Sequence, residues 1–218
     1  MERRISPRQS HLHTGGEVMI IDTDLLRAAL VCVAKEEQAK KHPGLTGVHI
    51  TRQHIEATNG NVVVRMELIE GKGAFFDESD ATNFDLVIRF CGDIPKEACF
   101  TEIQFGDEPR AIHLDDDNAA FSFTRLEIIN GRFPDLDKVI PTEKQSVMPY
   151  FRLEYLAYPY LMFRKGIVLI EPSGMEAPCR FRFSALTNEL YGNPIFIALP
   201  VYKDAFELAE QRLRELDL

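Results

Sequence analysis

The sequence lacks the common motifs that position reactive groups in enzymes. It has no glycine-rich phosphate-binding loop, no Gly-x-Ser-x-Gly and no His-Glu-x-x-His, and its histidines are not placed beside a nucleophile. We therefore expect a protein that is not an enzyme and that uses no cofactor. Cys-x-x-Cys pairs are absent too, so we expect no zinc site and no disulfide. The cysteines are predicted to be buried, reduced thiols: Cys32, Cys91, Cys99 and Cys179.

Long apolar runs are also missing. No stretch of about 18 apolar residues could span a bilayer, and no charged-then-apolar leader opens the chain. We expect a cytoplasmic protein without membrane contact. With 218 residues and 45% hydrophobic content, the chain is large enough for one large or two small domains with a packed core.

Positive charge is scarce for a protein whose whole surface binds nucleic acid. Asp and Glu number 34 against 25 Lys and Arg, which gives a net charge of −9, whereas phosphate binding needs clustered Lys and Arg. A local basic face is still compatible with this total. Residues 1–16, with Arg3, Arg4 and Arg8 and few apolar side chains, are predicted to form a basic mobile tail.

The pattern that follows predicts an α+β fold made of βαβββ units. A short apolar strand at Glu17–Ile21 leads into Asp22-Thr23-Asp24, which can cap a helix. Apolar residues at helical spacing then predict a helix that ends near His42. Three strands follow, and Asn59-Gly60 is a strong signal for a hairpin between the last two.

A second distinctive stretch is Asn130–Pro141, with the sequence NGRFPDLDKVIP. Asn130-Gly131 gives the backbone freedom for a turn, and Phe133 supplies a large apolar anchor that we expect to be buried. The two prolines fix φ and disfavour helix at the residues before them. The stretch therefore predicts a stiff, anchored connector between two parts of the chain.

Together these stretches resemble the bacterial sliding clamp, the β subunit of DNA polymerase III. In that family a Gly-Arg-Phe-Pro-Asp segment leads into a Val-x-Pro linker between domains, and the hairpin at 57–68 (ATNGNVVVRMEL) is similar to an Ala-Thr-Asp-Gly-x-Arg hairpin. Asn61 and Val62 stand where the family usually has a basic pair, which removes positive charge. The resemblance implies a DNA-clamp architecture.

The resemblance also implies that the chain contains three βαβββ units, two in a full clamp-like domain and a third in a half domain. Residues 17–141 correspond to one full clamp-like domain with its linker, in which the second helix is reduced to about one turn at Asp93–Ala98. Residues 142–202 correspond to a half domain, with a strand at Ser146–Arg152 and a helix at Leu153–Phe163 that Pro159 should end or kink. Residues 203–218 are predicted to be an additional C-terminal helix.

An odd number of units leaves one without its intramolecular partner, and exposed sheet edges are normally covered. We therefore expect a homo-oligomer, and a closed ring of twelve units would need four chains. The function implied is a replication accessory protein that embraces duplex DNA as an oligomer, without base reading, and tethers a partner. The alternative is a clamp-fold protein-interaction module, or regulator of replication, that binds no DNA.

The resemblance assigns candidate residues to each surface. The outward face of the first helix is the candidate DNA contact, and an apolar pocket for replication proteins should lie near the linker and the strand Leu199–Val201, which closes the half domain. The DNA candidates are Arg27, Lys35 and Lys41, and the pocket candidates are Val139, Ile140, Pro141, Leu199, Pro200 and Val201.

The last four residues carry a separate hypothesis. Glu215, Leu216, Asp217 and Leu218 resemble the Gln-Leu-Ser/Asp-Leu-Phe peptide that clamp partners insert into the clamp pocket, with Glu for Gln and no terminal Phe. The alternative is a fraying helix end. The predicted helix has an apolar seam at Phe206, Ala209, Leu213 and Leu216, which can pack on its own domain or on another subunit.

Overall fold

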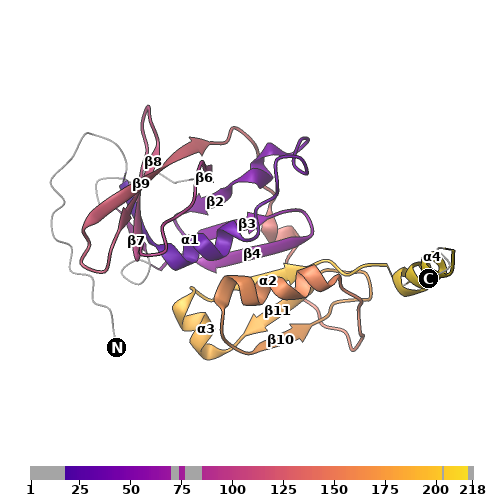
Figure 1. Ribbon diagram of the computed structural model, residues 1–218. Helices are drawn as coiled ribbons and strands as arrows, with labels where there is room; N and C mark the ends of the chain where they lie inside the picture. The colour runs from indigo at the N-terminus through magenta and orange to yellow at the C-terminus, as the bar shows by residue number, and fades with distance from the viewer. Residues whose placement is uncertain (1–17, 70–73, 77–84, 203, 216–218) are drawn as a thin grey trace.

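The structure is a computed structural model that describes residues 18–69, 74–76, 85–202 and 204–215 (Figure 1). The predicted basic tail at 1–16 lies outside the described residues. One antiparallel sheet of twelve strands dominates the fold, and its order is β10-β11-β12-β4-β3-β2-β6-β9-β8-β7-β1-β5. The predicted α+β clamp architecture is confirmed by this mixed fold and by its similarity to solved structures described below.

The first unit has the predicted β-α-β-β-β order. Its hairpin turns at Gly60, which has a φ of +88°, a left-handed value that favours glycine. The Asn59 side chain closes the turn by accepting the backbone N–H groups of Asn61 and Val62 at 3.0 and 3.1 Å. The elements are β1 (Val18–Asp22), α1 (Thr23–Leu30), β2 (Val48–Thr51), β3 (His54–Thr58) and β4 (Val62–Glu67).

The first helix is much shorter than predicted. Asp22 caps its start by accepting the backbone N–H of Asp24 at 2.9 Å, but α1 ends at Leu30. The backbone N–H of Ala34 donates to the carbonyl of Leu45 at 2.8 Å, so a tertiary contact takes the bond that would continue the helix. Residues 35–42, which were expected to be helical, form turns instead.

Among its described residues, the second unit contains strands and no helix. Turns occupy the place of the reduced helix at Asp93–Ala98. A short strand lies between Glu70 and Asn83, a stretch of which most residues are outside the described ones. The elements are β5 (Ala74–Phe76), β6 (Asp85–Phe90), β7 (Phe100–Gln104), β8 (Arg110–Leu114) and β9 (Ala120–Ile128).

The third unit begins with a helix that has the predicted bounds and does not end at Pro159. Its buried side chains Tyr155, Met162 and Phe163 hold both halves against the core. The predicted strand at Ser146–Arg152 is reduced to one bridge between Tyr150 and Val201. The elements are α2 (Leu153–Phe163), β10 (Val168–Glu171), β11 (Cys179–Phe183), the unpredicted α3 (Ala185–Leu190) and β12 (Ile195–Ala198).

The third unit joins the first inside one chain. Strand β12 pairs antiparallel with β4, with Phe196 opposite Val64, and α1 and α2 lie side by side on the same face of the sheet (Figure 1). The Cys32 thiol lies 3.5 Å from the sulfur of Met162 where the two helices meet. Burial raises the pKa of Cys32 far above its ordinary range.

The linker covers the other face of the sheet. Phe133 is buried, as predicted, and Leu136 is 1% exposed in the short 3-10 helix Leu136–Lys138. Both pack against Val63 and Ile197, which neighbour each other on β4 and β12 and point away from the main core because side chains alternate along a strand. Cys91 is exposed and Cys99 is partly exposed, contrary to the expectation of burial for all four cysteines.

Replacing Leu136 with alanine tests this outer layer. We expect Leu136→Ala to lower the free energy of unfolding by about 2–5 kcal/mol, because it leaves a cavity beneath the linker. Urea denaturation followed by circular dichroism measures the loss. The control is Leu213→Ala, at a side chain 53% exposed, which should change the value by less than about 0.5 kcal/mol. Equal effects of the two variants would contradict the packing of the linker.

Candidate partner-binding groove

An open groove of about 790 Å³ lies beyond the C-terminal end of strand β12. One wall is the segment Leu199–Val201, which follows β12. The backbone N–H of Leu199 donates to the carbonyl of Asn61 at 2.9 Å, and that of Val201 donates to the carbonyl of Tyr150 at 2.8 Å. The groove therefore lies where the β3–β4 hairpin, the third unit and the chain after β12 meet.

Helix α4 (Ala205–Glu215) forms the opposite wall. Its Phe206 ring meets the Tyr150 ring edge to face, with centroids 5.0 Å apart, and Leu208 and Ala209 face the groove beside it. None of the helix residues is buried, and the helix stands off from the rest of the protein at the end of the chain (Figure 1). The groove thus has one wall fixed by the sheet and one held by few contacts.

The groove contains only one of the two predicted pocket segments. Leu199, Pro200 and Val201 line it. Val139, Ile140 and Pro141 are not among its lining residues, and the first two pack against the outer cluster around Phe133 and Leu136 instead. The linker therefore supports the strand that leads to the groove and does not form the groove wall.

The aromatic residues of the groove were missed from the sequence. Tyr150, Phe151 and Tyr155 line it, and Phe151 meets the buried Phe181 ring edge to face at 6.0 Å. Their spacing in PYFRLEY is a usable signal, because two aromatics before a helix and one in its first turn can share one side. Large, rigid aromatic side chains of this kind are typical of protein-binding surfaces.

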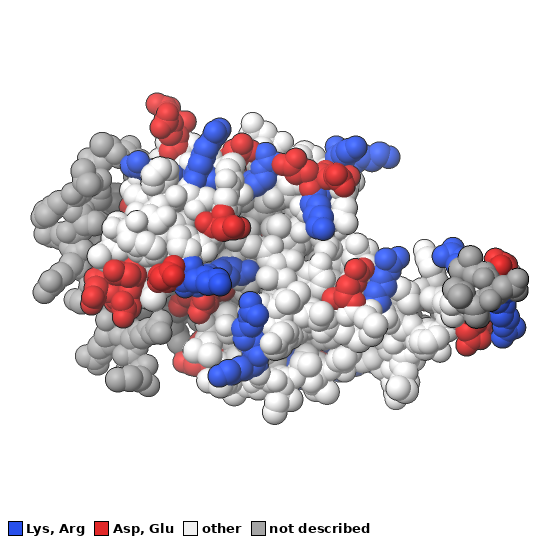
Figure 2. All heavy atoms as spheres, in the orientation of Figure 1, with Lys and Arg blue, Asp and Glu red and all other residues white. Residues whose placement is uncertain are grey.

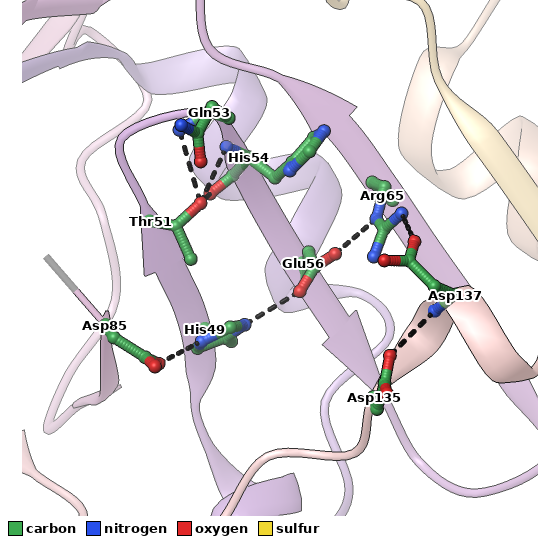
Figure 3. Close-up of polar contacts among 9 residues, drawn as sticks. All are labelled: His49, Thr51, Gln53, His54, Glu56, Arg65, Asp85, Asp135 and Asp137. Atoms are coloured by element: carbon green, nitrogen blue, oxygen red, sulfur yellow. Dashed lines mark hydrogen bonds and ion pairs between the residues drawn. The ribbon is translucent and has the colours of Figure 1, made fainter. Parts of the chain in front are cut away.

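A chain of polar contacts holds the linker against the sheet (Figure 3). The Glu56 carboxylate accepts from a ring nitrogen of His49 at 2.7 Å and from the guanidinium of Arg65. Arg65 also donates to Asp137 of the linker at 2.5 Å, and the Phe133 ring stacks on His49 with centroids 4.5 Å apart. The network crosses β2, β3 and β4 and ends on the linker, so it fixes the position of the linker on these strands.

This environment shifts the pKa values of the network. Burial of His49 opposes its protonation, but hydrogen bonds and charges from Glu56 and Asp85 outweigh that effect and raise its pKa. Burial alone would raise the pKa of Glu56, but its bonds with His49 and Arg65 lower it. The neighbouring His54 behaves in the opposite way, because burial and the positive charge of Arg65 lower its pKa.

The predicted DNA residues do not share a helix face. Arg27 is on α1, where it pairs with Asp24 at 2.9 Å and donates to the carbonyls of Pro95 and Lys96. Lys35 and Lys41 lie beyond the end of the helix. The helix α2 beside it contains no Lys or Arg. In Figure 2, basic and acidic side chains are interspersed over the face that carries these helices.

The predicted tail is only partly described. Glu215 is exposed at the end of α4 and accepts a hydrogen bond from Gln211 at 3.1 Å. Leu216, Asp217 and Leu218 lie outside the described residues. In the part of the chain that the structure describes, no helix is long and apolar enough to cross a membrane.

Solved structures with the same fold identify its class. The DNA polymerase III beta chain from Streptococcus pneumoniae has a TM-score of 0.58 and 16% identity, over 93% of this chain and 69% of that chain. Caulobacter crescentus pol III beta gives 0.56 and 12%, over 88% and 68%. The subunit from Borrelia burgdorferi, solved in complex with a natural product, gives 0.54 and 10%, over 90% and 67%.

No protein-family model and no curated protein sequence matches the chain. The solved structures nevertheless show that the fold is that of the bacterial sliding clamp family, and they confirm the resemblance inferred from the hairpin and the linker.

The pKa shifts predict a pH dependence of stability. A folded-state pKa of His49 above its ordinary 6.5 stabilises the fold below that value, and this contribution is lost as the pH rises through the folded pKa. The advantage of the wild type over His49→Gln in unfolding free energy should therefore be larger near about pH 5.5 than near about pH 8.5. Urea titrations at both pH values measure it.

His54→Gln is the matched control. Because the pKa of His54 is lowered, the unfolding free energy of the wild type should decrease relative to that of this variant as the pH falls. An advantage over His49→Gln that stays constant with pH would contradict the network.

Proposed function

We propose that the protein is a clamp-fold protein-interaction module of DNA replication, and that its groove binds an extended apolar peptide of a replication protein. The observation that carries the proposal is the groove, in which Leu199–Val201 and the aromatic rings of Tyr150 and Tyr155 offer an apolar surface of peptide size. Its volume of about 790 Å³ falls in the range of ligand-binding clefts, roughly 300–1,000 Å³.

The charges of the groove favour a particular kind of peptide. Arg152 and Arg212 lie at the lining together with Glu176 and Asp204, so polar ends of a peptide can be paired while its apolar side chains face the rings. A short peptide with two leucines and an aromatic residue, as in the family's Gln-Leu-Ser-Leu-Phe motif, has this character. The proposal has no catalytic component.

The composition of the helices argues against the DNA-embracing alternative. Together α1 and α2 carry one basic residue, Arg27, and its side chain already pairs with Asp24. Non-specific DNA binding depends on several Lys or Arg contacts to phosphates. We therefore assign partner binding to the groove and not to the face that carries α1 and α2.

Peptide binding tests the proposal. A labelled Gln-Leu-Ser-Leu-Phe peptide should bind with a micromolar or lower dissociation constant, measured by fluorescence anisotropy. Leu208→Lys should raise that constant about tenfold or more, because it places a charge in an apolar groove wall. Leu213→Lys is the control, on the same helix and outside the lining residues, and should have no effect. No binding at about 100 μM peptide would contradict the proposal.

DNA binding is the second arm. Duplex DNA should bind no more tightly than about 10⁻⁴ M at physiological salt, the weak end of non-specific binding. Micromolar binding that weakens on charge reversal of Lys35 and Lys41 would favour the embracing of DNA and contradict the proposal. Anisotropy of labelled duplex DNA at low and physiological salt separates the two outcomes.

A further inference from the structure

The complete domain of this chain shows how two clamp units close on each other. Each unit has a meander of three antiparallel strands, β2-β3-β4 in the first unit and β7-β8-β9 in the second. The first strand of each unit pairs with the strand that begins the meander of the other unit. Strand β6 pairs with β2, with Ile88 opposite Val48. Strand β1 pairs with β7, with Asp22 opposite Phe100. The exchange is reciprocal, so neither unit leaves its first meander strand uncovered.

The third unit contains the same first strand in rudimentary form. In the first unit, β1 directly precedes α1, and its second edge pairs with β5, which follows the last meander strand of that unit. In the third unit, Tyr150 lies just before α2 and pairs with Val201, which follows β12. The segment Tyr150–Arg152 is therefore the counterpart of β1, and its other edge has no strand beside it among the described residues.

Strand β10 is the counterpart of β2 and β7, because it begins the meander β10-β11-β12. It is one of the two edge strands of the sheet, and no described strand lies beyond it. Apolar side chains fill this edge: Val168, Leu169 and Ile170 are all exposed, Leu169 by 58%, and Ile167 before them is exposed as well. Edge strands of soluble proteins normally carry charges, prolines or a covering segment.

The two helices of the third unit expose apolar side chains as well. In Figure 2 the surface toward β10, at the bottom of the view, is largely without charged side chains. Large contiguous apolar patches mark interaction sites. The exposed apolar side chains of the two helices are Leu153, Leu156, Tyr160 and Leu161 on α2 and Leu186 and Leu190 on α3.

We propose that a second copy of this chain covers the patch, and that two third units complete one clamp-like domain by reciprocal strand pairing. Each unit supplies both the uncovered β10 edge and the first-strand segment that fits such an edge, so the surface is complementary to itself, as a two-fold interface requires. This interface needs neither DNA nor a bound peptide, although the backbone of its segment Tyr150–Arg152 belongs to residues that also line the groove.

The register of the pairing follows from the first domain. Asp22, the residue before α1, lies opposite Phe100, the first residue of β7. By the same rule Arg152 of one copy lies opposite Val168 of the other, and Tyr150 opposite Ile170. The free edge ends at Pro172, whose carbonyl already accepts the backbone N–H of Gln145 at 2.8 Å.

Pro149, just before this segment, has no backbone N–H to donate, so the ladder is short. Apolar side chains therefore carry most of the interface.

The solution mass tests the interface. Light scattering at about 50 μM should give twice the chain mass of 24.9 kDa, or four times if pairs assemble further, and Leu169→Lys should halve the particle. Phe123→Lys is the control, at a side chain 69% exposed on β9 in the first domain, and should leave the mass unchanged. Circular dichroism verifies that both variants are folded. A monomeric wild type, or an assembly that Leu169→Lys leaves intact, overturns the proposal.

Cysteine cross-linking tests the register and the reciprocity. In a Cys91→Ser background, which removes an exposed native thiol, chains with Arg152→Cys are mixed with chains with Val168→Cys and oxidised. Opposed residues are close enough for a disulfide, so a linked dimer should form on a non-reducing gel in the mixture. Much less should form in either chain alone. Equal cross-linking in all three samples, or none in the mixture, contradicts the pairing.

Discussion

The pairing of β12 with β4 is the contact on which the other surfaces of the molecule depend. It brings Ile197 beside Val63 and Phe196 beside Val64, so it contributes to the hydrophobic clusters on both faces of the sheet at once. It also sets α2 next to α1 and carries the chain past Asn61 into the groove wall. Without this pairing the third unit would have neither a core partner nor a fixed groove.

The linker reinforces that pairing from the opposite face. Leu136 packs over Val63 and Ile197, one from each strand, while Arg65 ties the linker helix to β3 and β4. The start of the linker passes so close to the backbone at Gly44 that it requires a glycine at position 131: a Cβ on Gly131 would lie 2.9 Å from the backbone nitrogen of Gly44. The linker thus works as a third layer of the fold.

Local signals in the sequence were sufficient where local chemistry decides the structure. Asn59-Gly60 predicted its hairpin, and the bounds of α2 were correct at Leu153 and Phe163. The end of α1 could not be read in this way, because the bond from Ala34 to Leu45 is a tertiary contact. The groove was predicted only in part for the same reason. Its segment Leu199–Val201 was recognised, but the aromatic side chains beside it depend on where the third unit docks.

Hydrogen exchange of the backbone amides tests the β4–β12 pairing most directly. If the third unit is part of one cooperative sheet, the bonded amides in Ile195–Ala198 should exchange as slowly as those in the β3–β4 hairpin, because both open only when the whole sheet unfolds. Protection of β12 that is lower by orders of magnitude than that of β3 and β4 would mean that the third unit opens by itself. That result would contradict the account of the sheet and of the groove built on it.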